Sequence, residues 1–287
     1  MQNLFTRRKL LTGIMKAGLC WPAVGGALSQ YGSGGGSSLT PPPPPGDGYP
    51  GTDDQLLEEI EKAGFLFFWE QADSTTGQVK DRALAAGNDT RIVSSIAATG
   101  FGLTALCIGA QRGYQPSADI TGRVRATLTF LLNQMQPQGQ NGFFYHFVDK
   151  TTGARASASE VSSIDTAILL CGVLMCREYL SEDAQIQSLA TQIYSNVDFG
   201  WMLNGGTALS MGWTPENGFL PYRWDSYSEL MMLYLLAIAS PTHAIAASRR
   251  GSSGGRFARV SISHTRSSCT TNPVAGAGLP KRPSRPS

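Results

Sequence analysis

Residues 213–243 read WTPENGFLPYRWDSYSELMMLYLLAIASPTH and end in a strongly apolar run. Within this stretch, residues 230–239 are apolar on nearly every side of a helix, and a helix of that kind has to be buried all round. The residues ahead of the run combine aromatic rings with charged groups. The stretch therefore predicts an aromatic loop that leads into a buried helix.

The same arrangement occurs earlier in the chain. Residues 159–170 read SEVSSIDTAILL, so that a serine and an acid, Ser162 and Asp165, stand at the entry of a second run, residues 164–175, that is apolar nearly all round. Residues 183–196, by contrast, are apolar on one side only. An alternation of fully buried and half-buried helices predicts an inner ring of helices covered by an outer ring, although a helical bundle or a helical repeat array produces the same alternation.

Apolar residues recurring at helical spacing predict an all-α fold. Phe65, Trp69 and Phe101 follow this spacing and are predicted to lie in the core. Strand signals are weak, and the aromatic pieces 142–147 and 219–224 predict small hairpins or loops between helices. The six predicted helices cover residues 56–68, 96–108, 124–135, 164–180, 186–201 and 227–238.

Asp165 and Glu229 are the candidate catalytic residues. Each follows a serine by three positions at the entry of an apolar helix, and two equivalent entries of an inner ring would point into one mouth. Hydrolysis of a glycosidic bond needs one carboxyl group to protonate the leaving oxygen and a second to activate water or attack. A serine followed by an acid at this spacing is also a capping box, which satisfies backbone N–H groups without any chemistry. The residue pattern alone favours the cap.

Aromatic side chains next to polar ones suit the apolar faces and hydroxyl rims of pyranose rings. Phe144 lies in such a loop, and His146 between aromatics can either bond a hydroxyl group or serve a structural role. Glu216 lies in the sequence Thr-Pro-Glu-Asn-Gly, which predicts a solvated turn. The candidate substrate-binding residues are Trp213, Tyr222, Arg223, Trp224, Asp225, Tyr145, His146 and Glu160.

Residues 213–243 and 159–170, together with 94–106 (SSIAATGFGLTAL) and 141–149 (NGFFYHFVD), resemble the glycoamylase-like family, which includes endo-acting β-1,2-glucanases of glycoside hydrolase family 144. The resemblance covers residues 53 to about 245. It implies a toroid of six helical hairpins, an (α/α)6 fold, with the active site at one mouth. It also implies hydrolysis of a β-linked glucan, with β-1,2 linkages favoured, and no metal or organic cofactor. With this resemblance, Asp165 and Glu229 are assigned to the cleft.

The two ends of the chain differ from its body. Residues 1–52 carry a net charge of +3 and residues 249–287 a net charge of +8, which leaves −9 for the middle, so the basic pI does not predict a nucleic-acid partner. Residues 1–29 contain a twin-arginine-like motif at Arg7 and Arg8 ahead of an apolar region, which predicts export to the periplasm or beyond. Residues 30–52 are a Gly/Ser/Pro linker. A lipid anchor at Cys20 is not favoured, because the preceding residue is Leu19. No membrane span is predicted in the mature chain.

The resemblance stops after residue 245. Members of the family continue with further helices and another acidic residue, whereas residues 246–287 are basic and lack apolar periodicity. We expect a disordered tail, encoded out of frame, after a truncated toroid domain at residues 53–245, and therefore impaired activity. Two alternatives remain open: a glycan-binding protein without catalysis, and a helical-repeat domain that binds a protein partner. His146, His243 and His264 form no ligand cluster in the sequence, so no metal is expected.

Overall fold

The computed structural model describes residues 49–246 except 86, 88 and 227. The chain divides into two units, Met1–Gly255 and Arg256–Ser287, and every described residue lies in the first. The predicted export signal (1–29), most of the linker (30–52) and nearly all of the basic tail (246–287) lie outside the described residues. Between residues 49 and 246, no helix combines the length and the apolar character that crossing a membrane requires.

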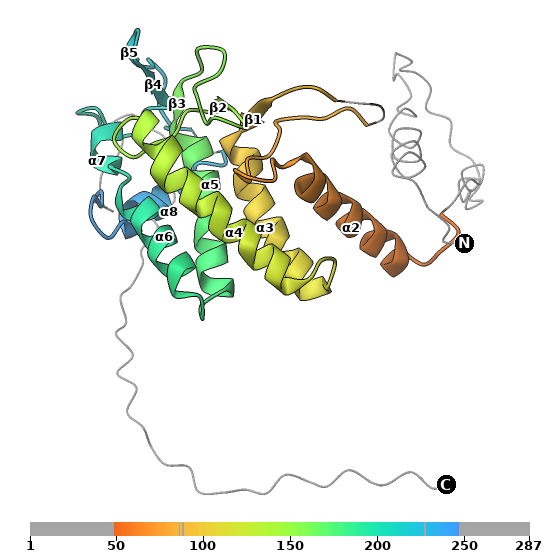
Figure 1. Ribbon diagram of the computed structural model, residues 1–287. Helices are drawn as coiled ribbons and strands as arrows, with labels where there is room; N and C mark the ends of the chain where they lie inside the picture. Colours follow the sequence, from red (N-terminus) through yellow and green to blue (C-terminus); the bar gives the residue numbers. More distant parts are fainter. Residues whose placement is uncertain (1–48, 86, 88, 227, 247–287) are drawn as a thin grey trace, which may run out of the picture. The chain divides into compact units, whose positions relative to one another are not determined.

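Helices dominate the described body (Figure 1), which confirms the predicted all-α class. Two small antiparallel sheets accompany them, β1 with β2 and β3 with β4 and β5. A π-helical turn η1 (Leu131–Met135) and a 3-10 turn η2 (Gln136–Gln138) follow α4. The helices are α2 (Asp53–Gln71), α3 (Ile96–Arg112), α4 (Ser117–Phe130), α5 (Ser163–Tyr179), α6 (Ala184–Ser195), α7 (Phe199–Met202) and α8 (Met231–Ala239). The strands are β1 (Val93–Ser95), β2 (Phe147–Asp149), β3 (Val161–Ser162), β4 (Gly212–Thr214) and β5 (Gly218–Phe219).

Helices α3 and α5 both begin directly after a short strand, and a serine caps each of them. The Ser95 hydroxyl accepts a hydrogen bond from the Ala98 N–H, and the Ser162 hydroxyl accepts one from the Asp165 N–H. Each serine thus satisfies an N–H group that has no partner inside its helix. The strands and their loops consequently gather around the N-terminal ends of these two helices.

Helices α3 and α5 pack backbone against backbone. A Cβ atom on Gly172 would overlap the carbonyl oxygen of Gly100, and one on Gly100 would lie 2.6 Å from the carbonyl oxygen of Ile168. Farther along both helices, the sulfur atoms of Cys107 and Cys176 lie 3.7 Å apart. Because both contacts join residues in the same order along the two helices, α3 and α5 run in the same direction.

The remaining helices surround this pair. Helix α2 packs on α3, and both α6 and α8 pack on α5. Helix α4 connects the outer helices, because the Arg123 guanidinium lies 4.2 Å from the centre of the Trp69 ring on α2 and Arg125 forms a 2.5 Å ion pair with Asp183, the N-cap of α6. Within the described residues, α3, α5 and α8 are inner helices and α2, α4 and α6 are outer ones. This arrangement confirms the prediction of an incomplete (α/α)6 toroid.

One face of each inner helix is exposed, as expected for a toroid that lacks part of its ring, whereas the apolar pattern taken alone predicted burial on every side. Cys171 and Met175 on α5 are exposed, as are Met231 and Leu235 on α8. Phe101 on α3, predicted to be core, is 57% exposed, whereas Phe65 is buried as predicted. The periodicity shows that all faces of these helices are apolar, but it does not show that the described chain supplies a neighbour for each face.

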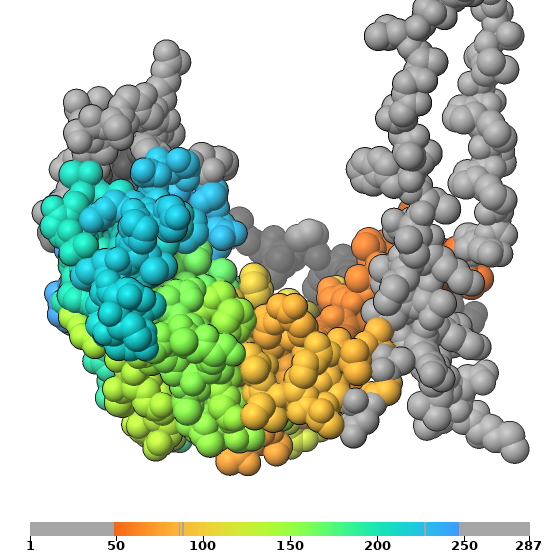
Figure 2. All heavy atoms as spheres, turned by 90° about the horizontal axis from the view of Figure 1, so that it is seen from above, coloured from red at the N-terminus to blue at the C-terminus, as the bar shows by residue number. Residues whose placement is uncertain are grey.

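Several helix boundaries also differ from the prediction; for example, α4 begins at Ser117, although residue 124 was the predicted start. Residues 186–201 form two helices, α6 and α7, because Asp198 caps α7 by accepting a hydrogen bond from the Trp201 N–H. The last helix begins at Met231 after a turn, although residue 227 was the predicted start. Figure 2 shows the end of the molecule at which the strands lie, where the orange segment before α3, the green segment around β2 and β3, and the cyan segment around β4 and β5 are neighbours.

We expect Gly172→Ala to lower the free energy of unfolding by about 1–3 kcal/mol, because the methyl group must push α3 away from α5. Gly122 provides the matched control, since it lies inside α4 and has nothing within 4 Å of an added Cβ atom. Gly122→Ala should raise the free energy of unfolding by roughly 0.5–1 kcal/mol. Urea unfolding measures both values. Equal effects of the two substitutions would show that the helix contact is looser than described.

Candidate functional site

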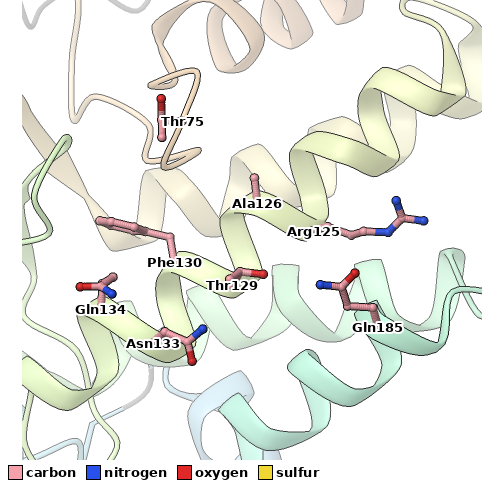
Figure 3. Close-up of a pocket in the computed structure, with 8 residues that line it drawn as sticks. All are labelled: Thr75, Arg125, Ala126, Thr129, Phe130, Asn133, Gln134 and Gln185. Carbon is pink, nitrogen blue, oxygen red and sulfur yellow. The ribbon is translucent and has the colours of Figure 1, made fainter.

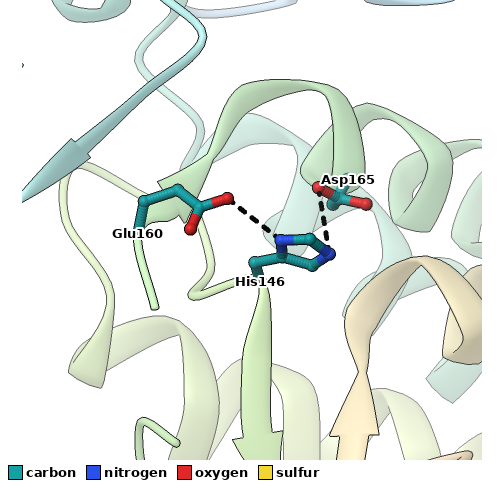
Figure 4. A group of neighbouring side chains, drawn as sticks. All are labelled: His146, Glu160 and Asp165. Carbon is teal, nitrogen blue, oxygen red and sulfur yellow. Dashed lines mark hydrogen bonds and ion pairs between the residues drawn. The ribbon is translucent and has the colours of Figure 1, made fainter. Parts of the chain in front are cut away.

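His146 joins two carboxylates near the N terminus of α5 (Figure 4). Its Nδ1 atom lies 3.0 Å from Oε1 of Glu160, and its Nε2 atom lies 3.6 Å from Oδ2 of Asp165. The side chains are 26% (His146), 31% (Glu160) and 13% (Asp165) exposed. Water, and therefore a ligand from solution, can reach all three groups.

Strand pairing brings these residues together from different parts of the sequence. Tyr145 forms an isolated β-bridge with Val161, and the His146 N–H donates to the carbonyl oxygen of Glu160 at 2.9 Å. Asp165 is the third residue of α5, which starts where β3 ends. The imidazole ring stacks on the Phe147 ring with a centroid distance of 3.8 Å. The orientation of His146 is therefore fixed on several sides.

Asp165 takes part in a cap and also faces His146. The Ser162 hydroxyl accepts a hydrogen bond from the Asp165 N–H and donates one to Oδ2 of the same residue. The Ser162 N–H bonds to the carbonyl oxygen of Phe144, so the carboxylate of Asp165 does not complete a reciprocal capping box. Oδ2 of Asp165 thus accepts from Ser162 and also faces the imidazole, and the assignment of Asp165 to a cleft stays a prediction.

This cluster can shuttle a proton, and it also offers ligands to a cation. An imidazole between two carboxylates can accept a proton on one nitrogen and donate one from the other. His146, Glu160 and Asp165 each offer one ligand atom, and these atoms lie within 4.8 Å of one another. The two ring nitrogens of His146 face different carboxylates, so the imidazole bridges Glu160 and Asp165. The absence of a metal stays a prediction.

The loop ahead of Glu160 has an unusual backbone. Ser157 and Ala158 have φ values of 52° and 50°, in the left-handed region that costs a non-glycine residue roughly 1–2 kcal/mol. Arg155 donates from Nε to the carbonyl oxygen of Ser159 at 2.6 Å and from Nη2 to that of Ala158 at 2.8 Å. Arg155 was not among the predicted site residues, because an arginine in a polar turn gives no sign of its distant partners.

Arg155 also reaches the turn between β4 and β5. Its guanidinium forms two hydrogen bonds with the carboxylate of Glu216, and the ion pair holds the pKa of Glu216 below its usual range. The guanidinium carbon lies 5.0 Å from the centre of the Tyr145 ring. Glu216 was predicted to be a solvated turn residue, and its side chain is indeed 54% exposed, but it holds a partner that lies far away in sequence.

Two predicted aromatic residues contact strand β3 and the first residue of α5. Trp213 on β4 pairs with Val161 on β3, and its ring lies 5.9 Å from that of Trp201. The indole N–H of Trp224 donates to the hydroxyl of Ser163, the first residue of α5, at 2.9 Å. The prediction that Phe144 meets a ligand is wrong, because its ring is fully buried in the core.

The other predicted residues are less closely joined to the cluster. Tyr222 is 67% exposed. The Arg223 guanidinium donates to the carbonyl oxygens of Leu203 and Ala208 and so closes that loop. Asp225 and Glu229 are exposed, and Glu229 lies in the turn before α8. The sequence predicted equivalent helix positions for Asp165 and Glu229, and this prediction is wrong. Asp165 is the third residue of α5, whereas Glu229 lies before the first residue of α8.

A hollow lies on the outer side of the helices (Figure 3). It has a volume of about 480 Å³ and lies between α4, η1 and α6. It contains none of the predicted site residues, and its charged residue Arg125 is already paired with Asp183. The residues lining the hollow are Thr75, Arg125, Ala126, Thr129, Phe130, Asn133, Gln134 and Gln185.

Comparisons with known proteins agree on one group of relatives, although no family model matches the sequence. An exo β-1,2-glucooligosaccharide sophorohydrolase of Parabacteroides distasonis is 26% identical over 209 residues, which are 69% of this chain and 28% of that protein. The structure of an endo-β-1,2-glucanase from Chitinophaga pinensis, in complex with sophorotriose and glucose, matches with a TM-score of 0.60 and 27% identity. That match covers 69% of this chain and 50% of the other.

A β-1,2-glucanase structure from Parabacteroides distasonis gives a TM-score of 0.63 and 25% identity over 70% of this chain and 30% of the other. The chain therefore spans half or less of the length of each of these relatives. The resemblance predicted from the sequence is confirmed: about 70% of the chain shares the glycoamylase-like fold of these β-1,2-glucanases, as one part of their longer domain.

Proposed function

We propose that the chain is part of a glycoside hydrolase for a β-linked glucan, with β-1,2-glucan as the favoured substrate. The observation that carries this proposal is the pair of partly exposed carboxylates, Glu160 and Asp165, that His146 joins near the N terminus of α5. The relatives named as β-1,2-glucan hydrolases support the choice of substrate. An uncharged glucan also places no demand on the net charge of the protein.

Asp165 and Glu229 remain the proposed catalytic carboxylates, with Glu160 and His146 as groups that hold substrate or Asp165. Inversion at a sugar carbon needs carboxyl groups roughly 6.5–9.5 Å apart, so that water fits between them. The ligand oxygens of Glu160 and Asp165 lie within 4.8 Å of each other, which is too close for that arrangement. The second carboxylate of an inverting reaction would therefore come from elsewhere, and Glu229 at the surface ahead of α8 is available.

A second candidate function is glycan binding without catalysis. It is favoured by the Tyr222 ring, which is 67% exposed and can stack on a sugar without any proton transfer. Measuring sophorotriose binding by calorimetry alongside the release of reducing ends separates the two functions. A chain that binds but releases no reducing ends is a glycan-binding protein, and a chain that does neither contradicts both proposals.

We expect Asp165→Asn and Glu229→Gln each to reduce glucan hydrolysis by about 100-fold or more, the usual effect of removing a proton-transfer group. Both substitutions keep the shape of the side chain, so the far-UV circular dichroism should stay unchanged. Release of reducing ends from β-1,2-glucan measures the effect. Wild-type turnover in both variants would show that the two acids have no catalytic role.

Ser162→Ala and Ser95→Ala form a matched pair. Each removes the N-cap of an inner helix and should lower the free energy of unfolding by about 1 kcal/mol. Only the Ser162 hydroxyl also bonds the Asp165 carboxylate, because the corresponding helix position after Ser95 is Ala98. Ser162→Ala should therefore weaken hydrolysis or sophorotriose binding, whereas Ser95→Ala should not. An equal loss of hydrolysis or binding in both variants would show that the loss comes from lower stability alone.

Tyr222→Ala should weaken sophorotriose binding by about tenfold, or 1.4 kcal/mol, while barely changing stability, because the ring is largely exposed. Trp213→Ala should weaken binding to a similar degree and also cost stability, since the ring contacts Trp201. Tyr179→Ala is the control, because this ring is also exposed but lies at the opposite end of α5. Unchanged affinity in both test variants would place the sugar elsewhere.

A further inference from the structure

We infer that Arg155 is the positioning residue of the His146 cluster: it holds the loop before Glu160 so that the Glu160 carboxylate meets Nδ1 of His146. The inference rests on the proposed function only for the statement that the cluster contacts a sugar. Arg155 itself reaches no predicted catalytic carboxylate through a recorded hydrogen bond within the described residues. Its effect on the site is exerted through Glu160.

The Arg155 side chain connects three separate segments. It contacts the main chain of its own loop at Ala158 and Ser159, the ring of Tyr145 and the carboxylate of Glu216. Its side chain is only 18% exposed. Since Tyr145 precedes His146 and Ser159 precedes Glu160, the guanidinium fixes the neighbours of both partners in the 3.0 Å contact between imidazole and carboxylate.

The loop needs such a contact because its own backbone preference works against it. Two consecutive non-glycine residues, Ser157 and Ala158, adopt left-handed conformations, and an unsupported loop would relax from them. Other contacts help, since the Ser159 N–H donates to the Ala156 carbonyl oxygen and the Ser159 hydroxyl donates to that of Phe147. Only Arg155, however, binds the carbonyl oxygens of both Ala158 and Ser159 among the recorded contacts of the described chain.

Arginine is suited to this role by its shape and by its permanent charge. The planar guanidinium directs Nε to one carbonyl oxygen while both Nη atoms reach a carboxylate, and a lysine cannot reproduce this fork. Glu216 pairs with the positive charge, which leaves the Glu160 carboxylate to His146. Because Glu216 lies in the turn after β4, the same ion pair links the strand that carries Trp213 to the loop that carries Glu160.

Hydrogen exchange and imidazole NMR test this inference on the whole chain without any substrate. In Arg155→Ala, the amides of residues 156–161 should exchange at least about tenfold faster, the ratio expected when a hydrogen bond to a charged group is lost. The ¹⁵N resonance of His146 Nδ1 should move to its position in Glu160→Gln, which reports loss of the same contact. Arg177→Ala is the control, because Arg177 pairs with its neighbour Glu178 at the far end of α5, and it should change neither readout.

Arg155→Lys and Glu216→Gln keep the inference testable if Arg155→Ala does not fold. Arg155→Lys keeps the positive charge but lacks the planar guanidinium, so it should change amide exchange and the His146 resonance in the same direction as Arg155→Ala. Glu216→Gln should accelerate amide exchange less than either Arg155 substitution. Wild-type exchange and an unmoved His146 resonance in the folded arginine variants would overturn the inference. If the chain neither binds nor cleaves glucan while these readouts change as expected, the proposed function fails and the role of Arg155 stands. A loss of sophorotriose affinity in Arg155→Ala that matches the loss in Glu160→Gln would support both.

Discussion

The contact between Gly100 and Gly172 is the constraint from which the rest of the structure follows. With no side chain on either residue, α3 and α5 approach until their backbones touch. Parallel inner helices at this distance bring their N termini, capped by Ser95 and Ser162, to the same end of the body. The strand that precedes each helix pairs there within its own small sheet, β1 with β2 and β3 with β4.

The site is a consequence of that convergence. The Ser162 hydroxyl donates a hydrogen bond to the Asp165 carboxylate, and the first turn of α5 fixes where that carboxylate lies. His146 and Glu160 stand beside it as an acid–imidazole pair that can exchange protons with solvent.

Apolar periodicity was sufficient to predict the helices, because burial on one side leaves a regular trace in the sequence. It predicted the alternation of inner and outer helices for the same reason. It could not predict that Phe101 and Met175 are exposed, since a pattern shows which face is apolar and not what covers it. Asp165 and Glu160 were found from a motif and a resemblance, but their link through His146 depends on the bridge between Tyr145 and Val161. The role of Arg155 likewise depends on Glu216, 61 residues away, and local sequence carries no signal for such a pair.

Asp165 and Glu229 differ in how firmly the chain holds them, and this difference bears on their roles. Asp165 lies inside the first turn of α5 and is bonded to Ser162 and faced by His146, so its position is set before any ligand arrives. Glu229 lies in an exposed turn ahead of α8, where a small backbone movement displaces the carboxylate. A preorganised group costs no reorganisation during the reaction, while a group on a turn can follow the sugar as it binds. The proposed pair therefore combines a fixed carboxylate with an adaptable one, and the fixed member is the one that the contact between the inner helices determines.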